Sequence, residues 1–246
     1  IDNLYKIFEN YHIKRANKLK DGNYIDINSS DDIINNLKIS SENYGKTQED
    51  TSEYLRKIME LCEGTKFGYY FKDIFKVKEE TIREYICKNG STYESSENIT
   101  HSIIMKDYKT TITYDAYVNN IIIDPPVKNT IGFEACDSKD IKMDEDDQMI
   151  SSVQHTPMGK YLILEHVLYN DRNQLIDKPK ILSEEIKTND GKKYLLKGAC
   201  YYLGSSESVD FGHYISVFKN GEQWYKANDA TINEINPNPN FKHKNY

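Results

Sequence analysis

Residues 212–229 read GHYISVFKNGEQWYKAND, and this stretch determines how the C-terminal part of the chain is interpreted. The segments 213–219 and 222–228 are rich in aromatic and β-branched residues, which are typical of strands. An Asn-Gly pair at 220–221 lies between them, and this pair is typical of a two-residue type I′ hairpin turn. We therefore predict a β-hairpin whose two strands are joined at Asn220-Gly221.

A turn at this position predicts which side chains lie opposite each other. Val217 is expected to face Trp224, and His213 to face Asn228, on one face of the sheet with Cβ atoms about 4.5–5.5 Å apart. The Asn228 amide could then accept a hydrogen bond from the imidazole and leave its other nitrogen free to take a proton. Such a histidine can act as base and acid near neutral pH. The alternative is an exposed histidine with a polar neighbour by chance.

Outward from the hairpin, the pattern predicts helices in the first third of the chain and mostly strands afterwards, which is an α+β fold. Acidic residues precede basic ones in the stretch after Thr47, so a helix is expected there, ending at Gly64. The remaining predicted elements are strands at 67–71, 82–86, 99–105, 161–164 and 193–203 and a Thr-capped helix at 114–123.

Charge and cysteine content exclude some classes of function. The chain has 32 Lys and Arg against 39 Asp and Glu, a net charge of −7, which predicts no nucleic-acid partner. No apolar run is long enough to span a membrane, so we expect no membrane as a partner. The four cysteines are too few for a disulfide framework and predict an intracellular protein of the cytoplasm or nucleus. They are Cys62, Cys87, Cys136 and Cys200.

Three segments around the hairpin together resemble the histidine box of the ubiquitin-specific proteases, which are papain-like cysteine deubiquitinases. The segments are Tyr194–Gly204, Asp210–Ser216 and Gln223–Asp229, and Ala227 departs from the usual Phe. The resemblance implies that His213 is the general base, that Asn228 orients it and that Asp229 supports the site. It also implies ubiquitin and ubiquitinated proteins as partners.

The family resemblance implies a papain-like α+β domain over residues 1–236, N-terminally incomplete, followed by a tail at 237–246. Its expected parts are a helical thumb at 1–66, β fingers at 67–150 and a β palm with the histidine box at 151–236. Residues 157–167 are similar to a palm strand of the family, although Glu165-His166-Val167 replaces Lys-Arg-Phe. We interpret His166 as a structural residue.

The segment Gln48–Leu55 is similar to the Gln-Gln-Asp-Ala-Gln-Glu-Phe-Leu helix start of the family. The resemblance implies that Asp50 and Glu53 contact the basic C-terminal tail of ubiquitin, a pairing that carboxylates and arginines favour. The alternative is that both are ordinary acids in the first turn of a helix, where they complement the helix dipole.

Many family members hold zinc between two Cys-x-x-Cys pairs. Here Cys87 and Cys136 each stand alone, and two thiolates cannot complete a four-ligand site, so we predict no zinc and no cofactor.

The nucleophilic cysteine of the family lies in a box upstream of the Gln-Asp helix, and no cysteine precedes Gln48 here. The four cysteines are expected to be packing residues. Because the chain starts at Ile1 without Met, within an apolar helical pattern, we expect the nucleophile upstream and the chain alone to be inactive. Two alternatives stay open: a catalytically dead ubiquitin-binding pseudoenzyme or scaffold, and an unrelated α/β interaction domain with a chance hairpin. The sequence leaves the oligomeric state unknown.

Overall fold

The computed structural model describes most of the chain from Thr51 onwards. It covers residues 51–61, 63–64, 66–87, 90–105, 113–124, 126–128, 148–167, 183–205, 208–229 and 231–236. The helices expected before residue 48 and the tail expected at 237–246 lie outside these residues. The chain divides into two compact units, Ile1–Tyr69 and Tyr70–Tyr246. None of the described helices is long and apolar enough to cross a membrane.

The first unit contains the helix predicted after Thr47. This helix, α3 (Thr51–Leu61), has Glu53 in its first turn, where a carboxylate complements the helix dipole. Gly64 follows the helix with a φ of 74°, the left-handed backbone that commonly ends a helix. The predicted end of the helix at Gly64 therefore agrees with the structure.

The next segment is a helix, α4 (Lys66–Ile74), and the strand predicted at 67–71 is wrong. The aromatic residues at 67, 69 and 71 alternate, but those at 67, 71 and 75 also follow the four-residue spacing of one helix face. The Phe71 and Phe75 rings contact each other with centroids 4.8 Å apart. Ring packing along one helix face therefore prevails over the alternating pattern.

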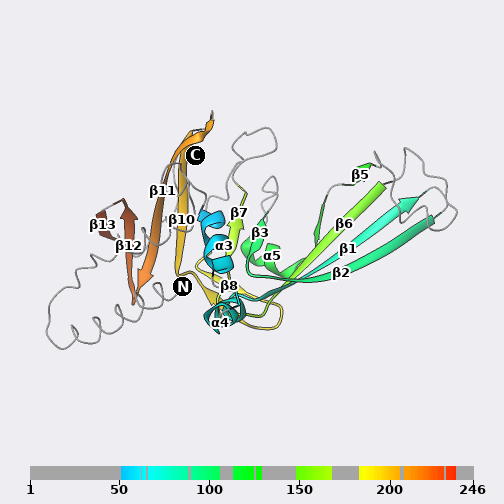
Figure 1. Cartoon of the computed structure of the whole chain (residues 1–246), viewed down its shortest axis with the longest axis horizontal. Coiled ribbons are helices and arrows are strands. Elements are labelled where there is room, and N and C mark those ends of the chain that lie inside the picture. Colours follow the sequence, from blue (N-terminus) through cyan, green and yellow to red (C-terminus); the bar gives the residue numbers. More distant parts are fainter. Residues whose placement is uncertain are drawn as a thin grey trace. The chain divides into compact units, whose positions relative to one another are not determined.

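The second unit contains a five-stranded antiparallel sheet in the order β2-β1-β6-β4, with β5 also paired to β6 (Figure 1). Strand β1 (Val77–Cys87) has its buried residues, Val77, Tyr85 and Cys87, on one face, as expected of a half-buried strand. The strands are β1 (Val77–Cys87), β2 (Gly90–Thr100), β4 (Ile122–Ile123), β5 (Val127–Lys128) and β6 (Gln148–Pro157).

Side-chain hydrogen bonds join β1 to β2 across this sheet. The Tyr85 and Tyr93 hydroxyls donate to the carboxylates of Glu94 and Glu84, each over 2.8 Å. Pairs of this kind stabilise a sheet by about 0.2–1 kcal/mol each. They explain how a strand as polar as β2 is retained in the sheet.

A second antiparallel sheet has the strand order β10-β11-β12-β13, drawn in yellow to red in Figure 1. It contains the predicted hairpin. Its strands are β10 (Gly198–Ser205), β11 (Ser208–Asn220), β12 (Gln223–Asn228) and β13 (Thr231–Ile235). The single strand predicted at 193–203 is two strands, because the chain leaves the extended ladder at Leu196-Lys197.

The described residues also include one helix and two small strand pairs that belong to neither sheet. Helix α5 (Tyr114–Asn119) begins at the predicted cap, where the Ala116 amide donates to the Thr113 hydroxyl over 3.2 Å. It ends before the predicted residue 123, because residues 122–123 pair with β6 instead. The strand pairs are β3 (Ile103–Met105) with β7 (Leu164–His166), parallel, and β8 (Glu185–Lys187) with β9 (Lys193–Leu195), antiparallel.

Two strand predictions in this region are only partly correct. The strand predicted at 99–105 is divided between the end of β2 and β3 by a bend at His101-Ser102. Of the strand predicted at 161–164, only Leu164 is extended, and Tyr161 is exposed. The buried core therefore forms around α5 and β3, not around 161–164. Its members are Val77, Ile103, Met105, Tyr114, Tyr117, Val118 and Ile186.

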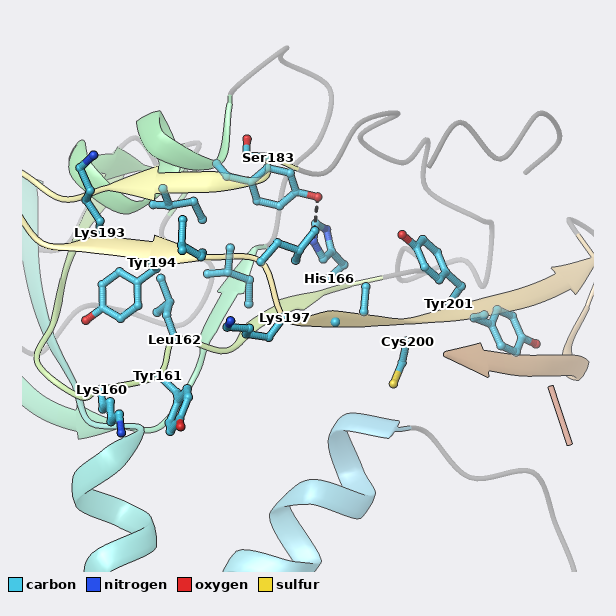
Figure 2. Close-up of a pocket in the computed structure, with 18 of the residues that line it drawn as sticks. Lys160, Tyr161, Leu162, His166, Ser183, Lys193, Tyr194, Lys197, Cys200 and Tyr201 are labelled. Atoms are coloured by element: carbon cyan, nitrogen blue, oxygen red, sulfur yellow. Dashed lines mark hydrogen bonds between the residues drawn. The ribbon is translucent and has the colours of Figure 1, made fainter. Parts of the chain in front are cut away.

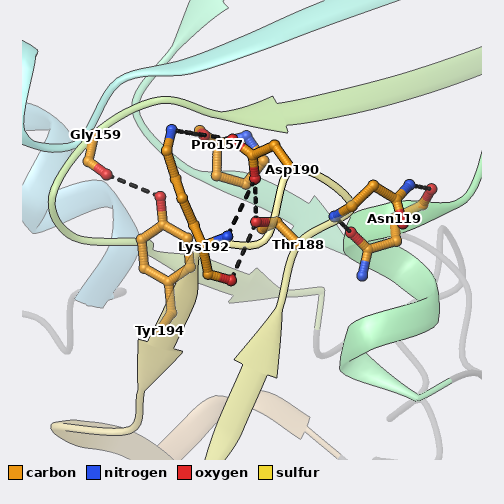
Figure 3. Close-up of polar contacts among 8 residues, drawn as sticks. Asn119, Pro157, Gly159, Thr188, Asp190, Lys192 and Tyr194 are labelled. Carbon is orange, nitrogen blue, oxygen red and sulfur yellow. Dashed lines mark hydrogen bonds and ion pairs between the residues drawn. The ribbon is translucent and has the colours of Figure 1, made fainter.

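Polar contacts join α5 to the β8–β9 hairpin (Figure 3). The Asn119 side chain accepts from the Asn189 amide over 2.8 Å and donates to the Lys187 carbonyl over 2.5 Å. The Lys187 amide in turn donates to the Asp115 carboxylate over 2.9 Å. These contacts link residues about seventy positions apart in the sequence.

Candidate active site

The predicted contact between His213 and Asn228 is present. His213 lies on β11, Asn228 is the last residue of β12, and the Nε2 atom of His213 is 2.5 Å from the Asn228 Oδ1 atom. An amide oxygen can only accept, so Nε2 carries the hydrogen. The neutral ring then has an unprotonated Nδ1 atom that can take a proton. The ring is half-exposed, so a proton donor can reach it.

The register that brings the two residues together differs from the predicted one. The tight turn lies at Gly221-Glu222, so Asn220 pairs with Gln223, and Val217 faces Lys226 instead of Trp224. The prediction that His213 and Asn228 are directly opposed is therefore wrong. A shift of two residues leaves every side chain on its predicted face, and diagonal neighbours remain within reach of long side chains.

The sign of φ in the turn explains the shift. Gly221 has a φ of 62°, whereas Asn220 and Glu222 are not among the residues with positive φ. A type I′ turn at Asn220-Gly221 needs positive φ at both positions. Glycine at the first central position is instead the pattern of a type II′ turn, which places Gly221-Glu222 at the tip.

Asp229 follows Asn228 directly and lies beside the same ring nitrogen. One Asp229 carboxylate oxygen is 3.8 Å from the His213 Nε2 atom. Asp229 has a φ of 49°, a positive value unusual for a residue other than glycine. The Thr231 hydroxyl donates to the Asn228 carbonyl over 2.7 Å and closes this turn. Sequence reasoning missed Thr231, although Asn and Asp at 228–229 are residue types that favour turns.

The proposed ubiquitin contacts are only partly described by the structure. Asp50 lies outside the described residues. Glu53 is exposed on α3, in the first compact unit. Its contact with ubiquitin therefore stays a prediction.

Neither described cysteine has the character of a nucleophile. Cys87, the last residue of β1, is buried and disulfide-bonded, so the prediction that it is a free packing cysteine is wrong. Cys200 on β10 is free and exposed, which also differs from the buried packing role predicted for it. Partial burial of its sulfur raises the pKa of the Cys200 thiol, which favours the protonated and less reactive form.

His166 has the structural surroundings predicted for it. Its Nε2 atom lies 3.3 Å from the Tyr114 hydroxyl, and the two rings meet edge to face with centroids 5.5 Å apart. Burial raises the pKa of Tyr114 to about 12, so this hydroxyl stays neutral at physiological pH.

An asparagine that hydrogen-bonds a histidine ring is an arrangement also found in papain-like thiol hydrolases. The sequence matches the model of the ubiquitin carboxyl-terminal hydrolase family over residues 3–245. The chain therefore belongs to this family, and the resemblance drawn from the histidine box is confirmed. No curated protein matches the chain in sequence.

Solved structures share the papain-like fold of the family with this chain. A chain in the SAGA Ubp8/Sgf11/Sus1/Sgf73 DUB module bound to ubiquitin aldehyde aligns with a TM-score of 0.56 and 15% identity. A second structure of this module, bound to monoubiquitin, aligns with a TM-score of 0.55 and 15% identity. A structure of the Ubp8-Sgf11-Sgf73-Sus1 SAGA DUB module aligns with a TM-score of 0.51 and 15% identity. The alignments cover 84%, 81% and 77% of this chain but only 50%, 47% and 45% of the other chains.

Proposed function

We propose that this chain carries the acid–base half of the active site of a deubiquitinase, an enzyme that cleaves ubiquitin from protein conjugates. The observation that supports the proposal most strongly is the 2.5 Å contact between His213 and Asn228 within a chain of this family. The proposed partners are ubiquitin and ubiquitinated proteins, with Asp50 and Glu53 contacting the basic tail of ubiquitin.

In the proposed reaction, a cysteine thiolate supplied from outside these 246 residues attacks the isopeptide carbonyl. His213, protonated at Nδ1, gives that proton to the departing lysine amine as the C–N bond breaks and a thioester forms. His213 then takes a proton from water, which attacks the thioester and releases ubiquitin with a free carboxylate, and the proton returns to the thiolate.

The neighbours of His213 suit this cycle. Asn228 accepts from Nε2 in both protonation states, so the working Nδ1 atom keeps its direction. The Asp229 carboxylate lies 3.8 Å from Nε2, on the same side of the ring as Asn228. Because Asp229 is largely exposed, its electrostatic effect is screened and it serves as a supporting group.

The test measures hydrolysis of a ubiquitin–fluorophore amide by the full-length gene product. We expect His213→Ala to lower turnover by roughly 10²–10⁴-fold, the usual contribution of a general base. Asn228→Ala should lower turnover by less, because the base itself remains. Cys200→Ala should leave turnover unchanged, and the isolated 246-residue chain should be inactive.

Two further outcomes would change the proposal. Turnover that depends on Cys200 would make that residue the nucleophile. A full-length product that binds ubiquitin without hydrolysis, more weakly with Asp50→Lys or Glu53→Lys, would establish the binding-only alternative. Absence of ubiquitin binding at high micromolar concentration would overturn both functions.

A further inference from the structure

The second unit contains a cavity of about 490 Å³ beside β7, the β8–β9 hairpin and β10 (Figure 2). We call it the β7–β10 cavity. Its volume lies in the range of small-molecule sites, about 300–1,000 Å³. The residues that line it include Tyr114, Lys160, Leu162, Ile186, Lys193 and Lys197.

The walls of the β7–β10 cavity are apolar and aromatic. Leu162, Leu164 and Ile186 contribute aliphatic surface, and Tyr114 and Tyr194 contribute rings. Burial raises the pKa of both tyrosines, so their hydroxyls remain neutral at physiological pH. Such walls favour an apolar ligand body and carry no charge of their own.

Within the described part of the chain, the charged side chains that line the cavity have one sign. They are Lys160, Lys193 and Lys197, and no described Asp or Glu lines it. This concentration of ammonium groups occurs in a chain whose net charge is −7. A cavity walled by apolar groups and bordered only by cations attracts anions and disfavours cations.

The three lysines are not equally available to a ligand. The Lys193 ammonium is already 3.4 Å from the Glu185 carboxylate. Lys160 lies over the Tyr161 ring, with its ammonium 5.5 Å from the centroid, and within the described part of the chain it forms no ion pair. Lys197 also makes no ion pair with any described residue, and in Figure 2 it lies between Leu162 and Cys200.

We propose that the β7–β10 cavity binds an amphipathic anion: a small ligand with an apolar body and one carboxylate. The body packs against Leu162, Leu164 and Ile186. The carboxylate pairs with Lys197, and Lys160 adds a second positive charge to the lining. This binding does not depend on the proposed hydrolase activity, because none of these residues belongs to the His213 site.

The probes are octanoate, octanol and octylammonium, which share one apolar chain and differ in charge. Each is titrated into the 246-residue chain, and binding is followed by NMR through the methyl groups of Leu162, Leu164 and Ile186. We expect octanoate to bind more tightly than octanol, and octylammonium to bind weakest. Equal affinities, tighter binding of octylammonium, or no shift of these methyl groups by any probe would overturn the proposal.

Charge variants locate the carboxylate. Lys197→Gln should weaken octanoate binding by roughly fivefold, as expected for a partly solvent-screened ion pair, and leave octanol binding unchanged. Lys160→Gln should act in the same direction. Lys226→Gln is the matched control, because this lysine lies on β12 and does not line the cavity. An unchanged preference for octanoate in the Lys160→Gln, Lys197→Gln double variant would reject the assigned anchors.

Discussion

At the scale of single residues, the position of His213 depends on a diagonal contact instead of a directly opposed pair. The β11–β12 ladder is paired only as far as Ser216 and Ala227, and Asn228 lies just beyond it. Asn228 pairs instead with Thr231 of β13, and its side chain approaches the His213 ring at 2.5 Å. The turn closed by Thr231 holds the backbone of Asn228 while Asp229 takes its unusual positive φ. Strain of this kind is often found at functional sites.

A second histidine, His101, predicts a pH dependence of stability. Burial, and then the positive charge of Lys72, lower the pKa of His101 below its usual value of 6.5. The unfolded chain therefore binds this proton more readily than the folded chain, and stability falls as pH falls. The loss begins as pH passes below about 6.5 and is complete below the lowered pKa of the folded state. The effect is modest because the ring is only partly buried.

The measurement is urea unfolding of the wild type and of His101→Gln across this pH range. The wild type should lose more stability than the variant on acidification. Lys72→Gln, which removes the repulsive charge, should lose an intermediate amount. Parallel curves for the wild type and His101→Gln would show that His101 takes its proton equally in both states.

At the scale of elements, Asn119 determines how the β8–β9 hairpin is attached to α5. Asn119→Ala removes the acceptor of the Asn189 amide and the donor to the Lys187 carbonyl. Because these groups are exposed to water, we expect a loss of about 1 kcal/mol in unfolding free energy, the usual net value of such hydrogen bonds. Asn120→Ala is the matched control and should change little, since Asn120 is exposed next to it.

Hydrogen exchange separates a local effect from a global one. The Asn189 amide should exchange faster in Asn119→Ala, whereas the Lys187 amide should keep its protection because Asp115 accepts from it. Equal acceleration at both amides would mean that the variant unfolds the hairpin as a whole.

At the scale of the whole second unit, Gly159 lies where the end of α4, the start of β1 and the end of β6 meet. Its amide donates to the Lys76 carbonyl over 2.8 Å, and its carbonyl accepts from the Tyr194 hydroxyl over 2.8 Å. A Cβ atom at this position would lie 2.4 Å from the Ile74 carbonyl oxygen and 2.7 Å from the Lys76 amide nitrogen. Both are backbone atoms, so the junction cannot accommodate a side chain without moving an element.

We expect Gly159→Ala to destabilise the protein by about 3 kcal/mol, the upper part of the range for overpacked sites. Gly191→Ala is the comparison: its Cβ would meet nothing within 4 Å, and only its φ of 85° opposes the change. We expect Gly191→Ala to lower the free energy of unfolding by about 1 kcal/mol. Chemical denaturation measures both, and equal losses would mean that the junction relaxes around the added methyl group.

Several features of the fold and site were predictable because their causes are local. The Thr113 cap of α5 was recognisable from neighbouring residues, since a cap bonds to an amide three positions away. Helix α4 was not recognisable from the sequence, because Phe67 and Phe71 satisfy both a two-residue and a four-residue spacing. The Asn119 contacts and the Gly159 junction join distant segments, and no local pattern in the sequence indicates them.

The residue pattern is enough to predict that His213 and Asn228 share one face of a hairpin, because strand side chains alternate with a period of two and an even shift in register preserves that face. The folded chain sets the turn at Gly221-Glu222, the diagonal approach of the two side chains and the positive φ of Asp229. These features depend on backbone conformations set by the neighbouring strands and on long-range pairing, whose energies the local sequence does not contain.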